Sequence, residues 1–235
     1  MGKISGYSFS LLLFLWTGVA FSQTDTNSMR TVDARVGFDV SKLALFYLQP
    51  ERKTLEGSLD MELFPSVYPT VELGVNTIRL KDSLFNYYSD GAYGRIGVDY
   101  NLVYPKNAGD KDMFMGGIRF GYARYTDHAD SIKIIDNYWG NFNGGSLPST
   151  AMNAEWLELL AGLKTEIFKH FFLGCSLRWR ILLSKTKEGL TDPYWIPGYG
   201  TGTDKSYFGF NYSIYYAIPV YKRQFKVKAV KKEEK

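Results

Sequence analysis

The 235-residue chain is poor in cysteine and histidine, with one Cys and two His. The single Cys175 excludes an internal disulfide framework. No spacing of Cys and His matches a zinc site, so we expect neither a metal nor another cofactor. The 28 Lys and Arg only slightly outnumber the 24 Asp and Glu, and much of the excess follows residue 221. The rest of the chain is close to neutral, which argues against nucleic-acid binding.

After residue 22 the chain lacks any apolar run of the roughly 20 residues that a membrane-spanning helix needs. Near the start, the apolar run Phe9–Phe21 follows Lys3 and leads into Ala20-Phe21-Ser22, a small-x-small cleavage pattern. We therefore predict a signal peptide at 1–22. An exported chain of this kind is either soluble or crosses a membrane as a closed barrel of strands.

What the exported part does contain is one-for-one alternation of apolar and polar residues, the period of a β-strand. In Thr54–Leu63, the apolar residues fall on one face and Glu56, Ser58, Asp60 and Glu62 on the other. Such alternation predicts eight strands, at about Val32–Val40, Thr54–Leu63, Thr70–Leu80, Ala92–Leu102, Met113–Tyr125, Ala154–Ile167, Phe171–Leu183 and Tyr207–Ile218. We expect Pro219 to end the last strand, because proline cannot donate to a ladder.

The connections between these strands alternate in length, as the loops and turns of outer-membrane barrels do. Long ones at 41–53, 81–91, 127–153 and 184–206 alternate with shorter ones at 64–69, 104–112 and 168–170. Aromatic residues make up 17% of the chain, which suits girdles at two membrane interfaces. We therefore predict an all-β fold, a single antiparallel up-and-down transmembrane barrel at 23–221 with both termini in the periplasm. A disordered basic tail at 222–235 would follow.

The export signal at Ala20-Phe21-Ser22, the strand pattern and the closing strand Phe208–Ile218 together resemble small eight-stranded, OmpA-like or porin-like barrels of Gram-negative outer membranes. The chain is more similar still to a family that carries only a domain-of-unknown-function label and shares this layout and a basic tail. The resemblance implies an outer-membrane location and contact with its lipid. One feature departs from many such barrels, because Tyr221, in the place of their terminal aromatic, is followed by a charged tail.

The residues predicted to face the barrel interior mix both signs of charge. They are Asp33, Arg35, Asp39, Glu56, Asp60, Glu62, Glu72, Arg95, Asp99, Arg119, Glu158, Lys164, Glu166, Arg178 and Arg180. Side chains just fill the interior of an eight-stranded barrel, and unpaired charges there are costly. We therefore expect an ion-pair network that plugs the lumen, with a narrow ion or proton path as the alternative.

Two predicted external loops combine aromatic residues with Asn, Asp and Gly. Tyr138, Trp139 and Phe142 belong to the first loop, and Tyr194, Trp195 and Tyr199 to the second. Rigid aromatics beside adaptable polar groups suit binding of a carbohydrate or protein. The alternative is that the loops fold over the barrel mouth and cover the interior. The basic tail would suit anionic head groups or a periplasmic partner.

The sequence therefore favours a non-enzymatic outer-membrane protein with a structural, surface-contact or partner-binding role. A first alternative is a barrel-embedded lipid-modifying hydrolase that uses His128 of Asp127-His128-Ala129-Asp130-Ser131, although nothing in this segment marks a strained nucleophile or an oxyanion hole. A second is a soluble, lipocalin-like periplasmic carrier, whose apolar face would line a ligand cavity. A small pore is the third.

Overall fold

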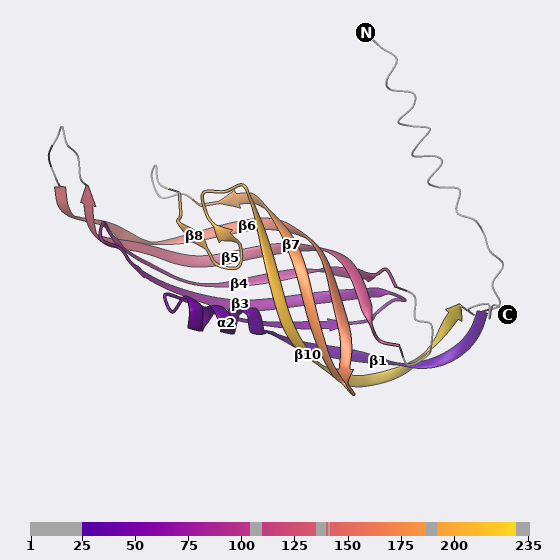
Figure 1. Cartoon of the computed structure of the whole chain (residues 1–235). Coiled ribbons are helices and arrows are strands. Elements are labelled where there is room, and N and C mark those ends of the chain that lie inside the picture. The colour runs from indigo at the N-terminus through magenta and orange to yellow at the C-terminus, as the bar shows by residue number, and fades with distance from the viewer. Residues whose placement is uncertain (1–24, 104–109, 135–139, 141, 187–191, 229–235) are drawn as a thin grey trace, which may run out of the picture.

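The computed structural model describes residues 25–103, 110–134, 140, 142–186 and 192–228, so the predicted signal peptide lies outside the described residues. Eight antiparallel strands form one closed barrel in the order β1-β10-β7-β6-β5-β4-β3-β2 (Figure 1). The strands are β1 (Asp25–Asp39), β2 (Arg52–Met61), β3 (Val67–Lys81), β4 (Asn86–Asn101), β5 (Met113–Ile134), β6 (Phe142–Phe168), β7 (Phe171–Lys185) and β10 (Ser206–Lys228). This up-and-down barrel confirms the predicted fold class.

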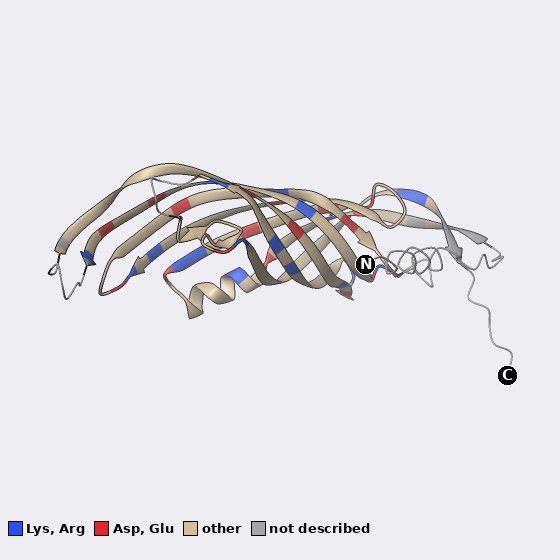
Figure 2. Ribbon diagram, turned by 90° about the horizontal axis from the view of Figure 1, so that it is seen from above, with Lys and Arg blue, Asp and Glu red and all other residues tan. Residues whose placement is uncertain are grey.

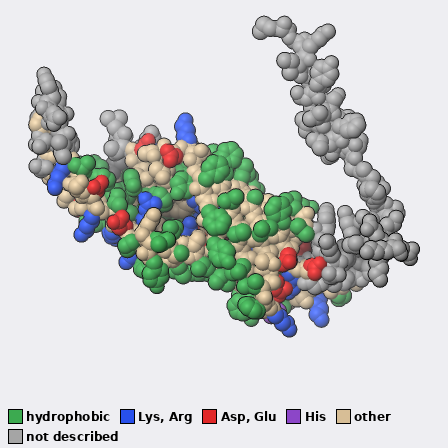
Figure 3. Space-filling view, in the orientation of Figure 1, with side chains coloured by type: hydrophobic (Ala, Val, Ile, Leu, Met, Phe, Trp, Pro, Cys, Tyr) green, Lys and Arg blue, Asp and Glu red, His purple; other side chains and the backbone are tan. Residues whose placement is uncertain are grey.

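Alternation sorts the side chains of each strand between the outside and the inside of the barrel. In β3, Val71, Leu73 and Val75 are 41%, 65% and 54% exposed, whereas Glu72 and Asn76 between and beside them are buried. Apolar side chains cover the middle of the outer surface, and charged ones gather toward the ends (Figure 3). A polar interior behind an apolar wall is the arrangement of a membrane barrel. The lipocalin-like alternative is wrong, since it requires the opposite faces.

Exposed aromatic side chains lie near both ends of this outer wall. At the end with the short turns, Phe171 packs edge-on against Tyr216, with 5.1 Å between ring centroids. Toward the other end, Trp179 stacks on Phe208 across the β7–β10 pair. Pairs at the two ends are what membrane-interface girdles require.

The strands extend beyond their predicted bounds at the long-loop end. β4 begins at Asn86, where the sequence pattern predicted a loop, and Asn86 pairs with Asp130 of β5. β5 and β6 continue as a ribbon that reaches beyond the other strands (Figure 1). Hydrophobic alternation does not predict these extensions. They lie beyond the apolar part of the outer wall, and a ladder of backbone hydrogen bonds needs no apolar face.

The last strand also differs from its prediction. β10 does not end at Pro219 but continues to Lys228, paired with the first residues of β1. Pro219 lies opposite Asp33 and Tyr221 opposite Val32, so Val220 is an extra residue in a β-bulge. Bulges tolerate proline because they interrupt the ladder there. Residues 222–228 of the predicted tail are therefore strand rather than disordered, and 229–235 lie outside the described residues.

A helix, α2 (Val40–Leu48), occupies the first connection, which the sequence pattern predicted as a loop. Asp39 at the end of β1 caps it, accepting a hydrogen bond of 2.9 Å from the Ser41 amide. The other Asp39 oxygen accepts one from the Asn211 side chain, which ties the helix start to β10. No helix in the described ranges is long and apolar enough to cross a bilayer.

Candidate functional site

The middle of the barrel interior is filled by paired charges, some from neighbouring strands and some from strands on opposite sides of the lumen. Glu72 of β3 lies opposite Arg95 of β4, and the Arg95 Nη1 donates to Glu72 at 2.5 Å. The same carboxylate accepts from Arg119 Nε at 3.0 Å and from Arg178 Nη1 at 2.6 Å. Charged residues of both signs recur along the strands around the barrel (Figure 2). Because the side chains of a β-strand alternate between its two faces, those at inward positions can meet in the lumen.

A second buried carboxylate, Glu158 of β6, extends this layer across the lumen. It lies 3.2 Å from Arg95 Nε, 3.2 Å from Arg178 Nη1 and 3.1 Å from Arg180 Nε. Glu56 binds Arg95 at 2.9 Å from the other side. All five side chains are at most 5% exposed. The layer thus satisfies each charge mainly through cross-strand partners rather than through water.

A smaller ion-pair group lies nearer the short turns. Asp60 binds Arg35 at 2.6 Å and Lys164 at 2.7 Å. Asp99 binds Arg119 at 2.8 Å, which connects this group to the central layer. Arg35, one of the residues predicted to face the interior, lies opposite Asp60 of β2 and is buried.

Two predicted network residues have different roles near the turns. Glu62 accepts a hydrogen bond of 2.9 Å from the Ser66 amide, and Glu166 accepts one of 2.8 Å from the His170 amide. Ser66 and His170 both have positive φ, of 63° and 70°. Each carboxylate therefore stabilises a tight turn whose backbone conformation is uncommon for a residue other than glycine.

A short hairpin covers the long-loop end of the interior. Its strands β8 (Trp195–Ile196) and β9 (Gly200–Thr201) pair with each other, and we call residues 195–201 the lid hairpin. Ile196 and Tyr199 are fully buried in one cluster with Tyr93 and Trp156. Below it, Trp156 Nε1 donates to Glu158 at 2.7 Å, so the aromatic layer joins the ion-pair layer directly.

Tyr199 anchors the lid hairpin through one hydrogen bond at its backbone carbonyl and another at its side-chain hydroxyl. Its carbonyl oxygen accepts a hydrogen bond of 2.9 Å from Arg180 Nη1, and its hydroxyl donates to the Asp204 carbonyl at 2.8 Å. Burial, reinforced by the nearby Asp204 carboxylate, raises the pKa of the Tyr199 hydroxyl to about 12. The hydroxyl therefore stays protonated at any physiological pH.

The predicted external contact residues divide into two groups. Phe142 and Tyr194 are 57% and 41% exposed, and Trp195 is half-buried beneath the Arg52 guanidinium, 4.2 Å from its ring centroid. Tyr199 is fully buried, so its predicted place on the outer surface is wrong: packing on Trp156 outweighs the loop composition. Tyr138 and Trp139 lie outside the described residues.

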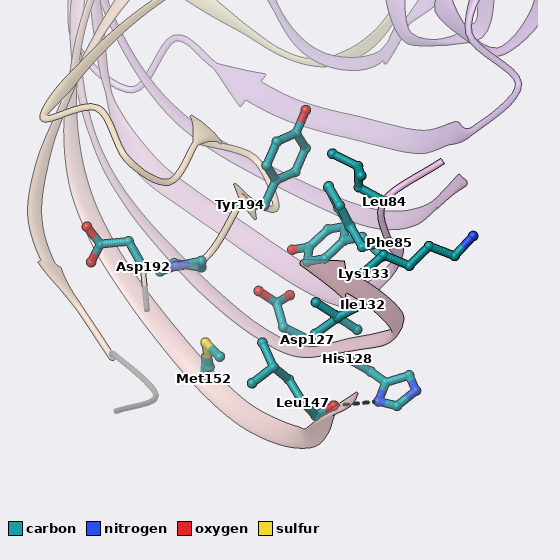
Figure 4. Close-up of a pocket in the computed structure, with 13 residues that line it drawn as sticks. Leu84, Phe85, Asp127, His128, Ile132, Lys133, Leu147, Met152, Asp192 and Tyr194 are labelled. Carbon is teal, nitrogen blue, oxygen red and sulfur yellow. Dashed lines mark hydrogen bonds between the residues drawn. The ribbon is translucent and has the colours of Figure 1, made fainter. Parts of the chain in front are cut away.

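Beside the lid hairpin is a pocket of about 380 Å³, which we call the mouth pocket (Figure 4). Its walls come from the β3–β4 turn, the extended ends of β5 and β6, and the segment before the lid hairpin. The lining residues are Leu84, Phe85, Tyr87, Asp127, His128, Ala129, Ile132, Lys133, Leu147, Met152, Asp192, Pro193 and Tyr194. The sequence pattern did not predict it, because its walls meet only when the polar ends of β4, β5 and β6 pair as strands.

His128 lies at the edge of the mouth pocket and does not form a catalytic triad with its neighbours. Its Nδ1 lies 2.9 Å from the Leu147 carbonyl oxygen, to which it must donate, and its Nε2 lies 3.7 Å from Asp130 Oδ2. A triad base instead donates to a carboxylate and accepts from the nucleophile. In the described part of the chain, no three His, Cys, Asp or Glu side chains are grouped so as to hold a metal ion.

Three solved structures are similar to this chain. The N-terminal β-barrel domain of OprF from Pseudomonas aeruginosa is 13% identical, with a TM-score of 0.39 over 81% of this chain and 100% of that one. A major outer membrane protein from Thermus thermophilus is 9% identical, with a TM-score of 0.46 over 81% and 100%. Neisserial surface protein A is 11% identical, with a TM-score of 0.31 over 83% and 99%.

No curated protein matches the chain. Residues 4–223 match a family described as a domain of unknown function, DUF6048. This match covers the eight barrel strands almost completely, and the chain therefore belongs to the DUF6048 family.

Proposed function

We propose that the chain is an integral outer-membrane protein of a Gram-negative bacterium, without enzymatic activity, whose plugged barrel presents a contact surface at its external end. The observation that carries this proposal is the reversal of polarity across the wall. Leu73 is 65% exposed on the outside, whereas the neighbouring Glu72 is 3% exposed and meets three arginines inside. Lipid is the environment in which such an exterior is stable.

The interior favours a plug over a pore. An eight-stranded barrel has room for side chains and little else. Here the central ion pairs span the lumen from Glu56 to Arg180, and the lid hairpin covers them with Ile196 and Tyr199. An ion crossing this barrel would have to break several charge-assisted hydrogen bonds in sequence.

The rim geometry favours a non-enzymatic role. His128 donates to a backbone carbonyl through the nitrogen that a triad would direct to a carboxylate. Ser131, the serine three residues after His128, interacts with Asp130. The role that fits is contact with outer-membrane lipid along the wall and with a carbohydrate, protein or small ligand at the external end.

We place the long extensions of β5 and β6 outside the cell and both chain termini in the periplasm. An even number of strands puts both termini on one side, and outer-membrane barrels have short turns on the periplasmic side. The ribbon formed by the start of β1 and the end of β10 would then enter the periplasm, where the exposed Lys222 would face a partner.

Two separate single substitutions, one on the outer wall and one at the external rim, test the membrane assignment. Leu73→Arg replaces a side chain on the outer wall, and Glu51→Arg replaces an exposed one at the external rim. Arginine at mid-membrane costs roughly 2–4 kcal/mol, whereas on a water-exposed surface it costs almost nothing. We expect Leu73→Arg, but not Glu51→Arg, to reduce the amount of folded protein in outer-membrane extracts. The folded protein is recognised on a semi-native gel because its band shifts on heating. Equal behaviour of both variants, with the wild type in the soluble periplasmic extract, would refute the proposal.

A further inference from the structure

We infer that the mouth pocket binds a small amphiphile, with an apolar body and a hydrogen-bond donor, such as an ammonium or hydroxyl group, at its inner end. The inference deepens the external contact role proposed above and rests on it for the orientation of the pocket toward the outside. Three features of the pocket carry it: apolar walls, a buried polar floor, and a wall formed by the segment that leads into the lid hairpin.

The walls are apolar and converge from separate parts of the fold. Leu84 and Phe85 come from the β3–β4 turn, Ile132 from β5, and Leu147 and Met152 from β6. A volume of about 380 Å³ lies within the usual range for small-molecule sites, roughly 300–1,000 Å³. Apolar walls that enclose such a volume favour the hydrocarbon or aromatic part of a ligand over an ion or a sugar.

The floor is polar and buried. Asp127 is 6% exposed, lies opposite Ser89 in the β4–β5 pair, and interacts with Tyr87. Figure 4 shows its carboxylate in the middle of the lining side chains. Two residues back along β5, on the same face but outside the lining, the Tyr125 hydroxyl is buried and makes no hydrogen bond within the described part of the chain. A donor at the inner end of the pocket would find the Asp127 carboxylate as its acceptor.

The charges around the pocket select the head group. The other carboxylate of the lining, Asp192, lies 3.1 Å from Lys185, whereas the Lys133 side chain is exposed at the outer edge. The inner end is therefore acidic. A donor, above all a cation, would be stabilised there by Asp127, and an anionic head group would be repelled by it.

The pocket also adjoins the lid. Tyr194 packs edge-on against Tyr87, with 5.3 Å between ring centroids, and the lid hairpin begins at the next residue. A ligand in the mouth pocket would therefore contact both the rigid barrel wall and the segment that leads into the lid.

The test compares two probes of nearly equal size that carry opposite charges at one end, 4-phenylbutylamine and 4-phenylbutyrate. Each is titrated calorimetrically into the detergent-folded full chain, with a micelle-only blank. We expect saturable binding of the amine, and at least tenfold weaker binding of the carboxylate. Asp127→Asn should weaken amine binding about tenfold, because the hydrogen bond from the ammonium would lose its charged acceptor. Asp204→Asn, which removes an exposed carboxylate outside the lining, should leave it unchanged.

A second variant tests the site independently of the buried charge. Ala129 is nearly buried and lines the pocket, so Ala129→Leu should fill it and abolish binding of the amine. A heat-shift gel of each sample shows whether the barrel is folded, which separates failure of this inference from failure of the proposed function. Equal binding of the two probes, no binding by a heat-shifting wild type, or unchanged binding by folded Asp127→Asn and Ala129→Leu would overturn the inference.

Discussion

Replacing Glu72 with glutamine tests whether the interior is held together by its charges. Three buried arginines share this carboxylate: Arg95 at 2.5 Å, Arg119 at 3.0 Å and Arg178 at 2.6 Å. The Glu72→Gln change would keep the shape of the side chain but remove its negative charge, so that three buried arginines lose the carboxylate they share. Removing one partner of a buried ion pair costs roughly 3–5 kcal/mol. Since native proteins are stable by only about 5–15 kcal/mol, this loss would be a large fraction of the total.

The matched control is Asp90→Asn, which also neutralises an ion-paired carboxylate. Asp90 binds Arg79 at 2.7 Å, but both side chains are about half exposed, at 49% and 46%. An exposed pair contributes about 0–1 kcal/mol, so the control should be nearly neutral. Unfolding in urea, followed by the loss of the fast-migrating band of vesicle-inserted protein, measures both variants against the wild type. A Glu72→Gln loss within about 1 kcal/mol of the control would show that the central ion pairs do not hold the barrel together.

Three further outcomes follow from single contacts. Gly121→Ala would put its Cβ 2.2 Å from the Trp156 ring and should cost about 1–3 kcal/mol in urea unfolding, whereas Gly116→Ala meets nothing closer than 4.0 Å and should be neutral. The folded-state pKa of Tyr199 lies above its unfolded value of about 10, so its contribution to stability is complete below pH 10 and is lost as pH rises toward 12. Tyr199→Phe should therefore flatten the stability profile in that window, and an unchanged slope would contradict the assigned cause. Asp39→Ala should cost about 1–2 kcal/mol through loss of the α2 cap, measured by the same unfolding assay, with exposed Asp204→Ala as the neutral comparison.

The sequence predicted the barrel well where one face of each strand is apolar and the other polar. Along β3 and β7 every second residue lies on the apolar outer wall and the others face the lumen, so polarity alone predicts the strand, its faces and the parity of its register. The pairing of Glu72 with Arg95 also follows from such parity once neighbouring strands are aligned. Arg35 lies inside for the same reason.

The alternation of apolar and polar residues was uninformative where the strands extend past the apolar part of the wall. Asn86 and Asp130 are paired strand residues, yet nothing apolar alternates around them. The strand continues through Pro219 because a bulge accommodates it, and a bulge leaves no signature in hydropathy. Tyr199 belongs to a loop whose composition suggests an exposed surface. Only its contact with Trp156, far earlier in the chain, decides that it is buried.

Single-channel recording in a planar bilayer distinguishes a plugged barrel from an open pore, because only an open lumen passes a steady ion current. The full chain, folded and heat-shifting, should insert without producing stepwise conductance. A variant that loses both the lid packing and a central anchor, Tyr199→Ala with Glu158→Ala, should open measurable steps, since these changes remove the cover and a carboxylate that holds three arginines. Steady conductance through the wild-type barrel would show that the central ion pairs and the lid hairpin do not plug the lumen.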